Sequence, residues 1–290
     1  MSPQSNNVPL GIALMIATTI VFATQDGISR HLAGEYNAMM VVMIRYWFFA
    51  AFVIALAART KGGVRAAART DQPMVQITRA LMLAGEICIA VFGFTLLGLV
   101  ESHAVFACYP LLIAALSGPI LGETVGWRRW IAIGIGFVGV IVILQPGMGV
   151  FDPVAIIPLI SAVMFAVYGL LTRYAARRDS TATSFFWTGT VGAIAMTGIG
   201  LWMWEPMSGP DWVWMGALCL SGVTGHWLLI RCYEAAEASA VQPFAYFHLV
   251  FAVLLGITLF GETLRTNVAI GTAIIVGAGL FTLWRERAQG

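Results

Sequence analysis

The sequence contains two copies of one short phrase, "PILGETVGWRRW" at residues 119–130 and "TLFGETLRTN" at residues 258–267. Each Gly-Glu-Thr follows one apolar run and precedes another. Glycine can adopt the left-handed conformation that ends a helix, threonine can cap the next helix, and glutamate favours a positive helix N-terminus. The motif therefore predicts a tight turn between two helices, with a direct role in substrate binding as the alternative. The predicted capping residues are Gly122, Glu123, Thr124, Gly261, Glu262 and Thr263.

The composition places the chain in a lipid bilayer. Of its 290 residues, 59% are hydrophobic and 10% are charged, and the mean hydropathy is +0.86. A soluble domain carries about 25% charged residues. The net charge is +2 without a dense basic cluster, which argues against nucleic acid as a partner. The four cysteines show no C-x-x-C spacing and the four histidines no zinc-ligand spacing, so we expect no disulfide, metal or cofactor. The N-terminus lacks a basic segment, so we expect no cleaved signal peptide.

Ten segments are apolar and long enough to cross a bilayer, which takes about 20 residues. They are residues 9–31, 38–58, 75–97, 104–121, 130–146, 154–173, 182–203, 212–231, 239–260 and 267–284. The predicted fold is an all-α polytopic membrane protein with ten transmembrane helices.

The basic residues predict the orientation. With the N-terminus in the cytoplasm, the inner side receives twelve basic residues and the outer side only Arg30 and Arg265. Loops rich in positive charge stay in the cytoplasm, so both termini are expected to be cytoplasmic. The membrane is expected to be a cell inner membrane. The inner set is Arg59, Lys61, Arg65, Arg69, Arg128, Arg129, Arg173, Arg177, Arg178, Arg231, Arg285 and Arg287.

The repetition extends beyond the turn. "ESHAV" at 101–105 parallels "EASAV" at 237–241, and "AIG" occurs at 132–134 and at 269–271. Each copy contains five predicted helices, and five is odd, so the second copy enters the membrane from the opposite side. The sequence predicts two inverted five-helix repeats, residues 1–147 and 148–290, an architecture of many secondary transporters.

This pattern resembles the drug/metabolite transporter superfamily in its ten-helix EamA-type branch. The resemblance covers essentially the whole chain and rests on "YPLLIAALSGPILGET" at 109–124 and "PFAYFHLVFAVLLGITLFGET" at 243–263. It implies a transporter of small organic metabolites, and the chain looks closest to bacterial exporters of amino acids, including aromatic ones. Alternating access through a central cavity at the midplane, lined by the first, third, fourth, sixth, eighth and ninth helices, is the expected mechanism.

Ionisable and aromatic side chains inside a membrane are the candidates for the substrate pathway. Glu86 is interpreted either as a contact for a substrate ammonium or a proton, or as a structural carboxyl. Each histidine and aromatic has a packing role as its alternative. The pathway candidates are Gln25, Asp26, Glu86, Tyr109, Tyr168, Trp187, His226, Trp227, Tyr246 and His248.

Asp26 and Arg45 are expected to interact directly or through water. Each lies about seven residues from its outer helix end, about 10 Å deep at 1.5 Å per residue. Matched depth would let each charge offset the desolvation cost of the other.

Two other function classes compete with a transporter. A membrane-embedded enzyme is disfavoured because G-x-x-x-x-G-K-[ST], H-E-x-x-H and G-x-S-x-G are absent from the sequence. A simple ion channel is disfavoured because charged residues that could line a pore are scarce. Saturable flux with counter-transport would favour the transporter, and product formation without net flux would favour the enzyme.

Overall fold

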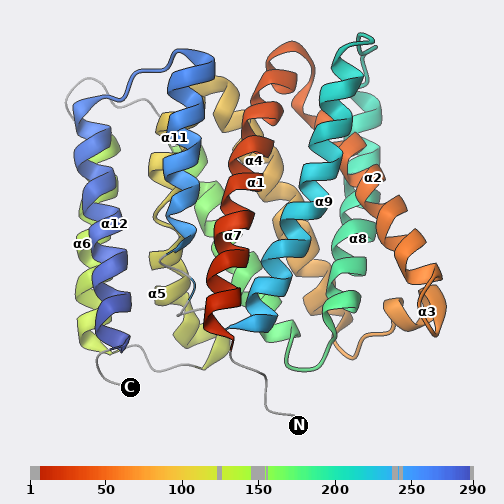
Figure 1. Ribbon diagram of the computed structural model, residues 1–290, viewed down its shortest axis with the longest axis horizontal. Helices are drawn as coiled ribbons and strands as arrows, with labels where there is room; N and C mark the ends of the chain where they lie inside the picture. The colour runs from red at the N-terminus through yellow and green to blue at the C-terminus, as the bar shows by residue number, and fades with distance from the viewer. Residues whose placement is uncertain are drawn as a thin grey trace.

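The computed structural model describes residues 7–122, 126–144, 154, 156–236, 241 and 244–287. These residues form a helical bundle (Figure 1). Its helices are α1 (Val8–Glu35), α2 (Ala38–Ala58), α3 (Gly63–Ala68), α4 (Pro73–Phe106), α5 (Tyr109–Leu121), α6 (Trp127–Leu144), α7 (Ile156–Ala175), α8 (Thr181–Trp202), α9 (Asp211–Ala235), α11 (Phe247–Phe260) and α12 (Thr266–Arg287).

The lengths of these helices confirm an all-α polytopic membrane protein. Six of them are long and apolar enough to cross a bilayer, namely α1, α2, α4, α7, α8 and the Asp211–Cys232 part of α9. Four shorter apolar helices, Tyr109–Leu121, Trp130–Leu144, Phe247–Phe260 and Thr266–Ala278, bring the described segments to ten. The exposed surface also fits a lipid environment. Along α6 it includes a stripe of apolar side chains, Ile131, Ile135, Val138 and Ile141.

The third and fourth predicted segments meet at a sharp reversal within α4. Gly98 has φ 82° and ψ 176°, which only glycine adopts without strain, and it interrupts the helix there. A Cβ on Gly93 would lie 3.6 Å from Ser102 Oγ, and the rings of Phe94 and His103 stack at 5.0 Å. Residues nine apart on one straight helix would be separated by about 13 Å along its axis, so the chain must turn back at Gly98. The predicted connection over residues 98–103 is therefore helix from Leu99 onward.

The two glycines of the repeated phrase end helices. Gly122 follows α5 with φ 75°, and Gly261 follows α11 with φ 65°. The capping role predicted for Thr263 is wrong, because α12 begins only at Thr266. Glu123 and Thr124, the corresponding predictions in the first copy, lie outside the described residues.

The two halves interleave. The main packing partners are α1 with α9, α2 with α8, α4 with α7, and α6 with α12, so each pair takes one helix from either half. Glycines allow the close approaches, as at Gly139 and Gly271, where an added Cβ on either residue would lie within 2.7 Å of the other's carbonyl oxygen. In Figure 1, α6 and α12 form one edge of the bundle and α2, α3 and α8 the other, with α1, α4 and α11 between them.

Candidate functional site

A cavity lies between the two halves of the bundle. The empty space at this cavity, with the open solvent at its mouth included, is about 870 Å³. Its wall comes from α1, α2, α4, α5, α7, α9, α11 and Ala245. Six of the predicted pathway residues line it: Gln25, Asp26, Glu86, Tyr109, His226 and His248. The wall also includes Arg45, from a helix that the sequence did not place at the cavity.

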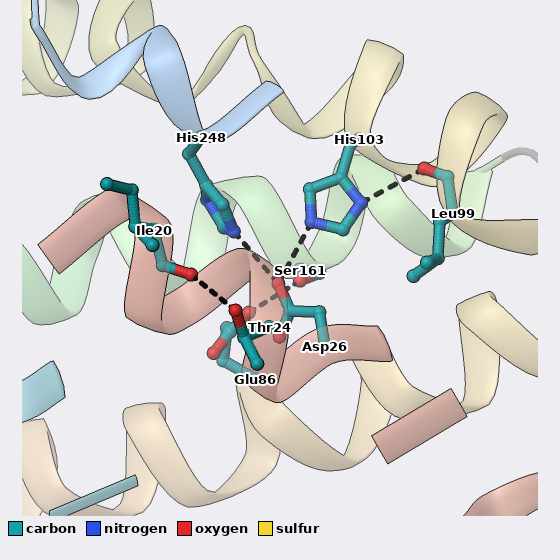
Figure 2. Close-up of polar contacts among 8 residues, drawn as sticks. All are labelled: Ile20, Thr24, Asp26, Glu86, Leu99, His103, Ser161 and His248. Atoms are coloured by element: carbon teal, nitrogen blue, oxygen red, sulfur yellow. Dashed lines mark hydrogen bonds and ion pairs between the residues drawn. The ribbon is translucent and has the colours of Figure 1, made fainter. Parts of the chain in front are cut away.

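Asp26 sits at the centre of a three-residue cluster, which we call the Asp26 cluster (Figure 2). Its Oδ2 lies 3.0 Å from Nε2 of His103 and 2.9 Å from Nε2 of His248. The three side chains come from α1, from the second segment of α4 and from α11. The cluster therefore connects both halves of the chain through a single carboxylate oxygen.

His103 is the main site residue that the sequence analysis missed. It belongs to "ESHAV" and was assigned to the loop before the fourth segment, where a histidine has no special meaning. Because the helix resumes at Leu99, His103 is only 3% exposed, and its Nδ1 lies 3.0 Å from the carbonyl oxygen of Leu99. Three of the five residues from Leu99 to His103 are polar, so no apolar run signalled a helix at this position.

Glu86 faces the same cavity from the first segment of α4. Its Oε1 accepts a hydrogen bond of 2.8 Å from Ser161 Oγ on α7, and the residue is 5% exposed. Figure 2 shows this pair close to the Asp26 cluster. Both carboxylates of the cavity thus have hydrogen-bond partners from other helices, as buried polar groups generally do.

Arg45 does not form the direct ion pair with Asp26 that the sequence predicted. Asp26 binds the two imidazoles instead, and no Asp26–Arg45 contact within 4.0 Å occurs among the described residues. Arg45 packs on α9, because a Cβ on Gly222 would lie 2.8 Å from its Nε. Since Asp26 and Arg45 line one cavity, a water-bridged interaction stays a prediction.

Three buried polar atoms of the wall have no hydrogen-bond partner among the described residues: Gln25 Oε1, Ser102 Oγ and His226 Nδ1. His226 packs between aromatic rings, with Phe22 at 5.2 Å and Phe49 at 6.0 Å. Burying an unpaired polar group costs about 1–3 kcal/mol. Each of the three atoms is itself covered by neighbouring groups, so a solute would reach it only after a side chain turns.

Glu262, which follows α11, is connected to the Asp26 cluster through Leu99 and lies outside the set of residues that line the cavity. Its two carboxylate oxygens accept hydrogen bonds from the backbone N–H groups of Leu99 and Val100, at 2.9 and 2.7 Å. Its Oε1 also pairs with Arg30 of α1. We call this arrangement the Glu262 clamp. The sequence assigned Glu262 to the helix that follows it, and that prediction is wrong: the carboxylate caps the helical segment beginning at Leu99.

Four predicted pathway residues lie away from the cavity wall. Tyr168 is 2% exposed and packs beneath Arg79, whose guanidinium carbon lies 5.4 Å from the ring centroid. Trp187 donates a hydrogen bond of 3.1 Å to the carbonyl oxygen of Ala68. Trp227 is 46% exposed, and Tyr246 is buried in an apolar cluster. The sequence placed these four rings within membrane-spanning helices, but it did not predict whether each ring faces the cavity, another helix or the lipid.

The ligating atoms of the Asp26 cluster lie within 4.8 Å of one another. Carboxylate and imidazole are ligand types that divalent metals use. The hydrogen bonds within the cluster satisfy the facing atoms without an ion, so we do not assign them as metal ligands.

Comparisons with known proteins agree along nearly the whole chain. The model of the EamA-like transporter family matches residues 9–145 and 153–284. An S-adenosylmethionine uptake transporter of Rickettsia prowazekii (strain Madrid E) is 24% identical over 277 residues, which are 96% of this chain and 93% of the relative. A riboflavin transporter of Rhizobium johnstonii is 26% identical over 292 residues, 99% of this chain and 95% of the relative. A crystal structure with 20% identity covers 99% of this chain and 100% of its own with a TM-score of 0.65, which shows the fold.

Proposed function

The chain belongs to the EamA-like transporter family and is a multi-pass membrane transporter of small metabolites, and we propose that its solute is amphoteric and carries a flat ring. The observation that carries this proposal is the presence of one basic and one acidic side chain, Arg45 and Glu86, in the wall of one cavity. A solute that carries a carboxylate and an ammonium group could pair with both side chains.

The charged groups support an amphoteric solute. Arg45 offers a guanidinium to a carboxylate of the solute, and a guanidinium is well suited to that contact. Glu86 offers a carboxylate to an ammonium group, while its other partner, Ser161, is neutral. A solute with both groups would pair with both charged side chains, which a solute with a single charge would not do.

The aromatic side chains support a flat ring. Phe106, Tyr109 and Phe165 line the cavity and contact one another, with ring centroids 5.0–5.4 Å apart. Phe22 and Phe94 add two further rings to the wall. Such a lining favours a planar group, which can stack on one ring and meet the edge of another.

Two solutes fit these requirements. An aromatic amino acid, the solute class implied by the sequence resemblance, carries an α-ammonium, an α-carboxylate and a ring. S-adenosylmethionine, the solute named for the Rickettsia relative, carries the same two groups with an adenine ring. Riboflavin, named for the Rhizobium relative, has the ring but lacks the amino-acid group, so it provides the contrast.

Transport in this proposal proceeds by alternating access in a bacterial inner membrane. We infer that the Glu262 clamp closes the end of the cavity that the count of basic residues predicts to face outside the cell. Release of this clamp would open that end, and rocking of the interleaved halves would close the other.

The test is uptake into proteoliposomes that contain the purified full-length chain. Labelled S-adenosylmethionine, phenylalanine, tryptophan and riboflavin are offered singly, with the same solute unlabelled inside for counterflow. We expect saturable counterflow of at least one amino-acid-bearing solute, and about a tenfold or greater rise in its KM in Glu86→Gln. Glu35→Gln, which changes an exposed carboxylate at the end of α1, is the matched control and should leave the KM unchanged.

The outcomes separate the alternatives. Counterflow of riboflavin alone would refute an amphoteric solute. Chemical conversion of a solute without net flux would favour an enzyme.

A further inference from the structure

We propose that the Asp26 cluster is a proton-binding site and that its proton holds the Glu262 clamp closed. Solute movement would then be coupled to proton movement. That coupling rests on the proposed transport function, whereas the proton site and its effect on the clamp do not.

The hydrogen bonds of His103 fix the number of protons. A carbonyl oxygen only accepts, so the contact of 3.0 Å with Leu99 requires a proton on Nδ1 of His103. The contact of 3.0 Å between Nε2 and Asp26 Oδ2 requires a second proton between those atoms. Either His103 is an imidazolium facing a carboxylate, or it is neutral and accepts from a protonated Asp26. In both cases the pair holds one proton more than a neutral imidazole beside an ionised carboxylate.

His248 completes the count. Its Nε2 lies 2.9 Å from the same Oδ2, which also requires a proton between the two atoms. A neutral His248 supplies it as Nε2–H. The three side chains then carry no net charge, which suits a buried position inside a membrane.

Loss of one proton breaks this arrangement. The cluster would carry a net charge of −1, and His103 would keep a single ring proton for two facing acceptors. If that proton stays on Nδ1, the Nε2 lone pair faces the Asp26 carboxylate. If it moves to Nε2, the Nδ1 lone pair faces the Leu99 carbonyl. One hydrogen bond is lost in either tautomer, and the released proton passes to water in the open cavity.

Leu99 connects the cluster to the clamp. Its carbonyl oxygen is the partner of His103, and its N–H donates to Glu262. Glu262 pairs in turn with Arg30, which stands one helical turn beyond Asp26 on α1. This series of contacts therefore begins and ends on α1, and it runs Asp26–His103–Leu99–Glu262–Arg30. His248 lies on α11, and Glu262 follows two residues after the end of that helix. Weakening the cluster therefore loosens the same backbone that the clamp holds.

Other titratable groups face the cluster, and the test must separate their effects. Those in the cavity wall are Arg45 from α2, Glu86 from α4, Tyr109 from α5 and His226 from α9, while Arg30 and Glu262 lie at the clamp. Glu86 is the principal competitor, since it is a second buried carboxylate with one hydrogen-bond donor, Ser161.

The experiment measures a distance across the closed end without any solute. The purified full-length chain carries spin labels at Gly34→Cys on α1 and Thr266→Cys on α12, with the native cysteines replaced by alanine. Both positions are exposed, and each lies four residues along the chain from a clamp residue, Arg30 or Glu262. The protein is placed in lipid nanodiscs with EDTA, which excludes metal binding. Double electron–electron resonance then gives the populations of short and long distances between pH 5.5 and 8.5.

We expect the short distance to dominate at low pH and the long distance to grow as the pH rises. Opening that releases one proton changes the open-to-closed ratio by at most about tenfold per pH unit. Asp26→Asn should abolish the response, and His103→Gln, which keeps a donor beside Asp26, should do the same. His31→Gln removes the histidine paired with Asp211 outside the cavity and should retain the full response.

Three results would overturn the proposal: a distance distribution that does not change with pH, an unchanged response in Asp26→Asn and His103→Gln, or a response lost in Glu86→Gln but kept in Asp26→Asn. A solute panel without counterflow would refute the proposed function and leave the distance result standing. Counterflow without proton movement, measured with a pH dye trapped in the vesicles, would refute the coupling alone.

Discussion

Replacing Glu262 by glutamine tests whether the clamp holds one end of the transporter closed. The carboxylate accepts two backbone hydrogen bonds, of 2.9 and 2.7 Å, and pairs with Arg30. In Glu262→Gln one oxygen becomes an NH₂ group. In one orientation this group faces the N–H of Val100, and in the other it faces the N–H of Leu99 and the Arg30 guanidinium, so a donor meets a donor in both. Gly256 and Gly98 lie against the same carboxylate, and a Cβ on either would approach it within 3.0 Å, so the amide has little room to turn away.

The size of the effect follows from these contacts. Loss of one hydrogen bond to a charged group costs about 1.5–3 kcal/mol. The Arg30 pair adds less, because the two side chains are 21% and 13% exposed and the pair is partly screened. A net destabilisation of about 2–3 kcal/mol corresponds to a shift of about 30- to 140-fold toward the open end.

The assay is the labelling rate of a cysteine behind the clamp. Ser102→Cys is a small change at a cavity position that is 2% exposed and lies one turn after Leu99. A membrane-impermeant thiol reagent is applied to intact cells at constant pH, and the rate reports how often the outer end opens. We expect labelling about 30- to 140-fold faster in the Glu262→Gln background.

Glu101→Gln is the matched control. Glu101 pairs with Arg265 at 3.2 Å, but Arg265 is 61% exposed, and such surface pairs contribute about 0–1 kcal/mol. Its labelling rate should stay within about fivefold of the parent. Equal rates in Glu262→Gln and Glu101→Gln would refute the clamp as the closing device.

Three further substitutions test separate parts of the structure. Gly98→Ala forces a side chain into φ 82° and places Cβ 2.7 Å from Glu262 Oε1, so it should lower the melting temperature, while Gly34→Ala, where Cβ meets nothing within 4 Å, should not. Gly222→Ala should raise the KM of an amphoteric solute about threefold or more with an unchanged amount of folded protein, because its Cβ would lie 2.8 Å from Nε of Arg45 and displace the guanidinium. Arg79→Met should destabilise the purified protein by about 3 kcal/mol in thermal unfolding, because the buried guanidinium donates to Gln76, Thr172 and Ser184, whereas Arg69→Met on the surface should change little.

The sequence was sufficient to predict the class of fold, because the lipid bilayer restricts which structures can span it. A bilayer requires long apolar helices, so apolar runs locate the spans whatever their packing. Six of the ten pathway candidates line the cavity because buried polar groups in a membrane face other protein groups. Aromatic residues gave no such direction: Trp227 faces outward and Tyr246 packs in an apolar cluster, since an aromatic ring is stable in lipid, in a core or beside a solute.

The partners of the charged residues were harder to predict because they depend on rotation and on distant segments. Asp26 and Arg45 have matched depths, yet Asp26 turns toward His103 and His248, which are 77 and 222 residues away. No local pattern fixes the rotation of α1 about its axis. The reversal between the third and fourth segments was expected over residues 98–103, but its confinement to Gly98 was not, because no local pattern distinguishes a one-residue turn from a short loop. That single φ angle moved His103 from an expected loop into the cavity wall.

Glu262 shows why local rules can identify the chemistry and still assign the wrong partner. A carboxylate beside a helix-ending glycine is favoured near a helix N-terminus, and the nearest one in sequence belongs to α12. The chain places a second N-terminus at the same end, because the reversal at Gly98 leaves the N–H groups of Leu99 and Val100 without carbonyl partners one turn earlier. Those N–H groups are less exposed to water than the start of a helix at the surface, so they gain more from a carboxylate. The capping interaction thus joins the second half of the chain to the first, and only the tertiary arrangement of the two halves selects between the two N-termini.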